Sequence, residues 1–159
     1  MMNIISHRGN INGKIVDKEN SPNYIDAAIR SGYQVEVDVR FAYGCFWLGH
    51  DTRQYKITKS WIIKRCNDIW YHCKNLDAAI ELKKMNANIK YFCHAKDSYV
   101  ITSTFHFWVH DLKLKLNNDC IIPLLSKKSV LNYQEQNVYA VCTDYADLYI
   151  SKLNNAMSR

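Results

Sequence analysis

Two acidic residues, Glu36 and Asp38, stand two positions apart in a segment, residues 34–40, that alternates strictly between apolar and polar side chains. In a strand, three valines would cover one face and the two carboxylates would lie side by side on the other. A solvent-exposed polar face is the plainer interpretation of this segment alone. If helices cover the valines, however, the carboxylates point inward, where unpaired charge is costly. A hard divalent cation such as Mg²⁺ or Ca²⁺ would then relieve their mutual repulsion.

Two histidines stand where neighbouring strands are expected to end. His7 closes the expected strand at residues 3–7, and His50 follows the expected strand at residues 45–48. Histidine titrates near neutrality, so such a pair can act as general base and general acid. Arg8 adds a planar guanidinium that suits a phosphate. Taken singly, each histidine is more often a hydrogen-bonded structural residue.

The elements that must position these residues are short apolar runs and a few helices. Further strands are expected at residues 69–74, 89–94, 99–102, 105–109, 120–125 and 138–143. Helices are expected from Pro22 to Gly32, at residues 60–67 and 76–85, and from Asp147 to the end. This order favours an α/β sheet or barrel over a β-sandwich.

Four motifs in order along the chain carry a family resemblance. His7-Arg8-Gly9, Glu19-Asn20, Glu36-Val37-Asp38-Val39 and His50-Asp51 closely resemble the signature of the glycerophosphodiester phosphodiesterases. Phosphatidylinositol-specific phospholipase C and spider sphingomyelinase D share the same superfamily. Residues 141–147 are similar to the last strand of that family and the Thr-Asp-x-Pro-Asp turn after it. The resemblance covers residues 3–51 and 138–150 well and residues 69–81 loosely.

The resemblance implies an α/β fold, an abbreviated TIM-type (β/α) barrel that forms a single domain over residues 1–159, with the site at the C-terminal ends of its strands. TIM barrels typically need about 250 residues, and this chain has 159. We therefore expect several outer helices to be missing. Hairpins or short loops should replace them between residues 89 and 138.

The resemblance also implies a role for each site residue. His7 would be the catalytic base and His50 the catalytic acid. Arg8 and Lys74 would bind the phosphate of the substrate. The metal ligands would be Glu36, Asp38 and His72, and the supporting residues would be Glu19, Asn20, Asp51 and His94. In the family, an acidic residue occupies the place of His72. Histidine there shifts the preference of the site from Mg²⁺ or Ca²⁺ towards Mn²⁺ or Zn²⁺. The alternative for His94 is a satisfied core histidine.

The implied activity is metal-dependent cleavage of glycerophosphodiester-like or related small phosphodiesters, a hydrolase of lipid metabolism. One alternative is a weakly active or inactive barrel that binds a phosphorylated ligand, which the histidine at position 72 favours. A basic nucleic-acid-binding module is a second alternative, because the net charge is +6 and aromatic residues make up 13%. The lysines and arginines are dispersed along the chain, so we expect no nucleic-acid partner.

Composition and cysteine usage set the remaining expectations. Apolar residues make up 48% and charged residues 23%, as in an ordinary globular domain. No apolar run approaches the roughly 20 residues of a membrane span, and no signal-peptide pattern opens the chain, so we expect a cytoplasmic protein. The six cysteines form no C-x-x-C pair and are expected to be buried free thiols. A zinc site at Cys73, Cys93 and nearby histidines is the alternative.

Overall fold

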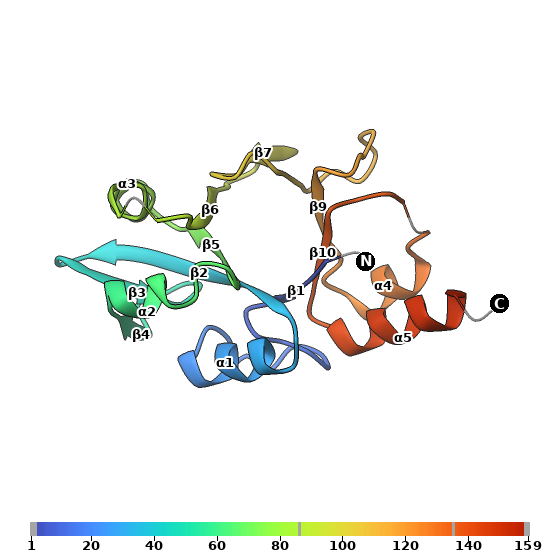
Figure 1. Cartoon of the computed structure of the whole chain (residues 1–159), viewed down its shortest axis with the longest axis horizontal. Coiled ribbons are helices and arrows are strands. Elements are labelled where there is room, and N and C mark those ends of the chain that lie inside the picture. The colour runs from blue at the N-terminus through green and yellow to red at the C-terminus, as the bar shows by residue number, and fades with distance from the viewer. Residues whose placement is uncertain (1–2, 86, 135, 158–159) are drawn as a thin grey trace.

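The computed structural model describes residues 3–85, 87–134 and 136–157 (Figure 1). Its strands are β1 (Asn3–His7), β2 (Gln34–Ala42), β3 (Cys45–Leu48), β4 (Tyr55–Ile57), β5 (Ile69–Cys73), β6 (Lys90–Cys93), β7 (Tyr99–Ile101), β8 (Phe107–Val109), β9 (Cys120–Pro123) and β10 (Ala140–Thr143). Its helices are α1 (Pro22–Arg30), α2 (Lys59–Ile63), α3 (Leu76–Lys84), α4 (Lys127–Asn132) and α5 (Ala146–Met157).

All of these strands belong to one mixed sheet of ten strands. Strands β6, β5, β2, β1, β10, β9 and β8 follow one another as parallel neighbours. The pairs β2–β3, β3–β4 and β7–β8 are antiparallel. Figure 1 shows the strands along a curved path from β3 and β2, through β1 and β10, to β9 and β7. The parallel arrangement brings the C-terminal ends of β1, β2 and β5 to one edge.

The prediction of an abbreviated TIM-type (β/α) barrel is wrong. The structure is a curled half-barrel made mostly of strands, and the five short helices of its described part do not follow each strand in turn, since β2, β3 and β4 and likewise β6, β7, β8 and β9 succeed one another without a helix. The chain runs from β6 through β7 and β8 to β9 without a helix. A β-α-β crossover needs a dozen or more residues, whereas only residues 102–106 join β7 to β8, and these two strands pair antiparallel. The hairpin expected within residues 89–138 is therefore present.

Two short elements were missing from the sequence-based prediction. These are β4, which extends the β2–β3 hairpin, and α4. Helix α4 begins with a capping box formed by two serines three positions apart. The Ser126 side chain accepts from the Ser129 backbone amide, and the Ser129 side chain accepts from the Ser126 backbone amide. Its six residues are too few to establish a helical apolar period. The expected helix at residues 60–67 is shorter and ends at Ile63.

The valines of β2 are fully buried, as the interpretation of an inward-facing carboxylate pair requires. Val35, Val37 and Val39 belong to one apolar cluster, together with Ile25 and Ala28 of α1 and Ala78 and Leu82 of α3. Because side chains alternate along a strand, the two helices on this face direct Glu36 and Asp38 to the concave side of the sheet. That side is filled below the site by aromatic residues, among them Trp70, Phe92 and Trp108.

The longest helix of the described residues, α5, has 12 residues. Within that part of the chain, no helix combines the length and the apolar character needed to cross a membrane.

Candidate functional site

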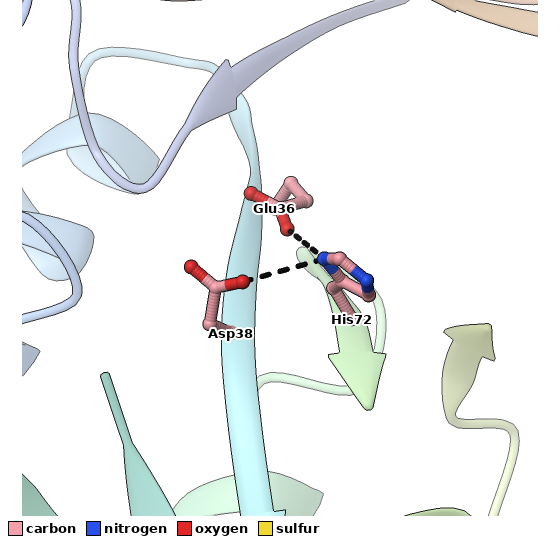
Figure 2. Close-up of side chains that lie close together, drawn as sticks. All are labelled: Glu36, Asp38 and His72. Carbon is pink, nitrogen blue, oxygen red and sulfur yellow. Dashed lines mark ion pairs between the residues drawn. The ribbon is translucent and has the colours of Figure 1, made fainter. Parts of the chain in front are cut away.

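Glu36, Asp38 and His72 converge on the concave side of the sheet, at the junction of β2 and β5. Asp38 and His72 are register partners on these parallel strands. The Nδ1 atom of His72 lies 3.3 Å from Asp38 Oδ1 and 3.6 Å from Glu36 Oε1. Figure 2 shows the three side chains directed towards one another, the two carboxylates from β2 and the imidazole from β5. Each offers a ligand atom within 4.8 Å of the other two.

The surroundings of this triad fit a cation. Glu36 is 2% exposed and Asp38 is fully buried. Among the described residues, neither Glu36 Oε2 nor Asp38 Oδ1 has a hydrogen-bond partner, although buried polar atoms nearly always have one. A divalent ion would satisfy both oxygens. Two carboxylates and one imidazole form a donor set that suits Mn²⁺ or Zn²⁺ at least as well as Mg²⁺ or Ca²⁺.

Asp38 is held in position by residues of the segment that follows β1. Arg8 Nε lies 2.8 Å from Asp38 Oδ2, and Arg8 Nη1 lies 3.1 Å from Glu19 Oε2. Asn20 donates from its side-chain amide to Asp38 Oδ2 and accepts from the Asp38 backbone amide. Glu19 and Asn20 therefore belong to the hydrogen-bond and ion-pair network of Arg8 and Asp38, and their supporting role stays a prediction. Arg8, predicted to hold a phosphate, pairs with the carboxylates of Asp38 and Glu19.

The turn after β1 adopts backbone conformations that are costly for ordinary residues. Arg8 and Asn20 have positive φ angles of 55° and 62°, and each such residue costs of order 1 kcal/mol or more. Hydrogen bonds from Arg8 N to the Glu36 carbonyl and from Asn20 N to the Arg8 carbonyl fix this turn against β2. At Gly9 a Cβ atom would lie 2.7 Å from the Tyr24 ring, so only glycine fits. Strained backbone of this kind concentrates at functional sites.

His7 is oriented by Asp144, which was not among the predicted site residues. His7 Nδ1 lies 2.7 Å from Asp144 Oδ1, and His7 Nε2 lies 3.7 Å from Glu36 Oε2. Asn10 donates to both Asp144 and Glu19, which joins the two carboxylates to one network. Asp144 follows β10, whose Thr143 is the register partner of Ser6 beside His7. The Thr-Asp turn of the resemblance was the available signal.

His50 lies beside the site through its backbone. The amide of the preceding Gly49 donates to the Asp38 carbonyl, and the Arg40 guanidinium donates to the carbonyls of Gly49 and His50. The imidazole is 42% exposed, and its Nδ1 lies 2.7 Å from Asp51 Oδ1. Among the described residues, the recorded polar contacts of this ring include no other predicted site residue. The structure thus places His50 and Asp51 together at the rim.

Lys74 and His94 complete the predicted set. Lys74 Nζ lies 3.6 Å from Asp38 Oδ1. The His94 ring lies 6.1 Å from the ring of His72 and stacks on His110 at 3.5 Å, so His94 is at the same rim. The alternative zinc site is not present, since the candidate metal cluster of the described residues contains no cysteine.

Charge and burial shift the protonation of the triad. Burial alone raises the pKa of Asp38, but the close approach of the His72 imidazole and the charge of Arg8 outweigh it and hold the pKa well below its usual range. Burial lowers the pKa of His72, yet its contacts with the Asp38 and Glu36 carboxylates raise it to about 9. For His7, burial is likewise outweighed, by the hydrogen bond to Asp144 and the charge of Glu36, and the pKa rises.

The raised pKa of His72 predicts how the stability of the cation-free protein depends on pH. A folded-state pKa of about 9, against about 6.5 in the unfolded chain, means that protonated His72 stabilises the fold below pH ~6.5. That contribution disappears as the pH rises through about 9. The charges that face His72 are those of Glu36, Asp38, Lys74 and His94. We expect the free energy of unfolding in chelator to fall by about 3 kcal/mol between pH 6 and 9.5.

Urea denaturation across this pH range measures the effect. His72→Gln removes the titrating imidazole and should flatten the profile. An identical pH profile in the wild type and the variant would show that His72 is not the titrating group.

No protein-family model, curated protein or solved structure matches this chain. The resemblance to glycerophosphodiester phosphodiesterases therefore stays a prediction that rests on the motifs and on the geometry of the site.

Proposed function

We propose that this protein binds a divalent cation through Glu36, Asp38 and His72 and uses it to cleave a small phosphodiester of the glycerophosphodiester type. The observation that carries the proposal is the convergence of two buried carboxylates and one imidazole, with carboxylate oxygens that lack hydrogen-bond donors among the described residues. Two further features support it. A carboxylate-oriented histidine, His7, lies next to Glu36, and the cationic Lys74 lies next to Asp38.

The cation, when bound, would neutralise the charge that develops on the phosphoryl oxygens. Lys74 would donate to a phosphoryl oxygen from the same side, because its ammonium group lies beside Asp38. Arg8 contributes mainly by fixing the position of Asp38, with which it is paired at 2.8 Å. In this proposal, the phosphate group of the substrate would lie between the triad and Lys74.

His7 is the general base of the proposed reaction. Asp144 accepts from Nδ1 and so keeps Nε2, which points towards Glu36, free to take a proton from the attacking hydroxyl. That hydroxyl belongs to water or to the substrate itself. His50, at the rim, would give a proton to the leaving alcohol once its ring turns from Asp51 towards the site.

A second candidate function is binding of a phosphorylated ligand without turnover. It is favoured by one specific observation: the His50 ring is paired with Asp51, an 88% exposed residue, rather than with the triad. This candidate uses the same cation and the same Lys74, and it differs only in lacking the acid that completes the reaction.

Hydrolysis of bis-p-nitrophenyl phosphate tests the proposal. We expect Mn²⁺-dependent release of p-nitrophenol that chelator abolishes and added Mn²⁺ restores. His72→Ala should lose both the Mn²⁺ binding measured by calorimetry and the hydrolysis. Hydrolysis that survives chelation would contradict the proposed role of the cation, and tight Mn²⁺ and phosphate binding without any hydrolysis would favour the second candidate.

A further inference from the structure

Two cysteines lie side by side on neighbouring strands, on the face of the sheet opposite the triad. Cys73 ends β5, Cys93 ends β6, and the two are register partners in this parallel pair. Parallel neighbours lie about 4.8 Å apart and direct register-paired side chains to the same face. The Cys73 thiol donates to the Tyr71 carbonyl, and the two neighbouring thiols perturb each other's pKa. No other two cysteines of the described residues are register partners.

The two thiols differ in exposure. Cys73 is 4% exposed and belongs to the apolar cluster under α3, whereas Cys93 is exposed to solvent. This corrects the expectation that all six cysteines are buried. The neighbouring Cys73 thiol lowers the pKa of Cys93 to about 7, so thiolate is present at neutral pH. An exposed thiolate next to a sheltered thiol is the arrangement of an attacking and a resolving cysteine.

We propose that Cys73 and Cys93 form a reactive dithiol that small disulfides, such as glutathione disulfide, oxidise to an intramolecular disulfide. The Cys93 thiolate attacks one sulfur of the small disulfide, forms a mixed disulfide and releases one thiolate. Cys73 then loses its proton and attacks the Cys93 sulfur, which forms the Cys73–Cys93 bond and releases the second small thiol. The protein dithiol loses two electrons and two protons, and the small disulfide becomes two thiols.

The spacing of the strands allows this bond. Disulfides join Cα atoms 4.4–6.8 Å apart, and the separation of about 4.8 Å between parallel strands falls inside that range. The bond would tie the C-terminal ends of β5 and β6 together, next to His72 and His94 on the opposite face. The inference does not rest on the proposed function, because it uses neither the cation nor the reaction.

The test is treatment of the folded, reduced full-length chain with glutathione disulfide, followed by alkylation of free thiols and peptide mass spectrometry. We expect a peptide cross-linked between Cys73 and Cys93 that a reductant reverses. Cys66→Ser, which alters a half-buried cysteine outside the pair, should behave as the wild type. Cys93→Ser should form no cross-link, and Cys73→Ser should retain glutathione on Cys93.

Two results would overturn the inference. One is a wild-type protein that keeps glutathione on Cys93 while Cys73 stays reduced, as expected for an isolated surface thiol. The other is a disulfide between the Cys93 residues of two chains. If Cys73→Ser does not fold, Cys73→Ala at the same buried position provides the trapped adduct, and the cross-link in the wild type still decides the question.

Discussion

Asp38→Asn should destabilise the cation-free protein by about 3–5 kcal/mol, the usual cost of removing one partner from a buried ion pair. Asp38 is fully buried and lies 2.8 Å from Arg8 Nε, 3.3 Å from His72 Nδ1 and 3.6 Å from Lys74 Nζ. The neutral amide leaves these cationic groups without their shared counter-charge. The amide nitrogen that the substitution introduces would face the Arg8 and Asn20 donors if it replaces Oδ2, or the His72 and Lys74 donors if it replaces Oδ1.

Urea denaturation at pH 6 in chelator measures this loss. At that pH His72 is protonated, because its pKa is about 9, so the uncompensated charge is greatest. Asp17→Asn provides the matched control, since Asp17 is exposed and the same change of charge should there have little effect on the free energy of unfolding. Equal stability of the two variants would show that the Asp38 network contributes nothing to the fold. The same Asp38→Asn protein should also fail to bind Mn²⁺ in calorimetry.

The sequence predicted the triad well because its signals are local. Strict alternation in residues 34–40 sets Glu36 and Asp38 on one face, and the same rule places His72 and Lys74 together on one face of the β5 segment. Whether the carboxylate face is also enclosed depends on the helices that cover the valines, and the segment alone favoured a solvent-exposed polar face. The relative register of β2 and β5, which places Asp38 opposite His72, follows from packing and no local pattern encodes it.

The architecture was less predictable because it depends on how distant segments pair. The resemblance at both ends of the chain implied a barrel, but the short connections around β7 and β8 produce a hairpin and a curled half-barrel instead. Asp144 was missed as a site residue for a similar reason. Its position beside His7 follows from the pairing of β1 with β10, two segments at opposite ends of the chain. Local periodicity carries no information about that contact.

If the proposed reaction is correct, His7→Asn should lower kcat for bis-p-nitrophenyl phosphate by about 10²–10⁴-fold, the usual contribution of a general base. Asp144 contacts His7 Nδ1, which leaves Nε2, the ring nitrogen that faces Glu36, as the atom that accepts the proton. Asparagine keeps a hydrogen-bonding group of similar reach towards Asp144 but cannot accept the proton near neutral pH. The Mn²⁺ affinity should stay within about threefold, because His7 is not one of the three ligands.

Asp144→Asn separates positioning from proton transfer. The amide can still contact His7 Nδ1, but it offers that atom a donor as readily as an acceptor and so favours the wrong tautomer. We expect a loss of kcat in the same range. The acid limb of the pH profile should also move to lower pH, because the hydrogen bond and the charge of Asp144 both raise the pKa of His7. The two variants should therefore differ in their pH profiles. Asp144→Asn, which alters a positioning residue, should keep the acid limb at a lower pH, whereas the residual activity of His7→Asn, which lacks the base, should show no acid limb.

His106→Asn is the matched control for both variants. His106 precedes β8 and contacts Trp70 and Tyr139, away from the triad, so its loss should leave kcat and Mn²⁺ affinity unchanged. A folded His7→Asn protein with normal turnover would refute the assignment of the base, whatever the cation requirement of the reaction. Loss of Mn²⁺ binding in that variant would instead make His7 a fourth ligand, because its Nε2 lies only 3.7 Å from Glu36 Oε2. The paired measurements of kcat and Mn²⁺ affinity therefore separate the two roles available to this imidazole.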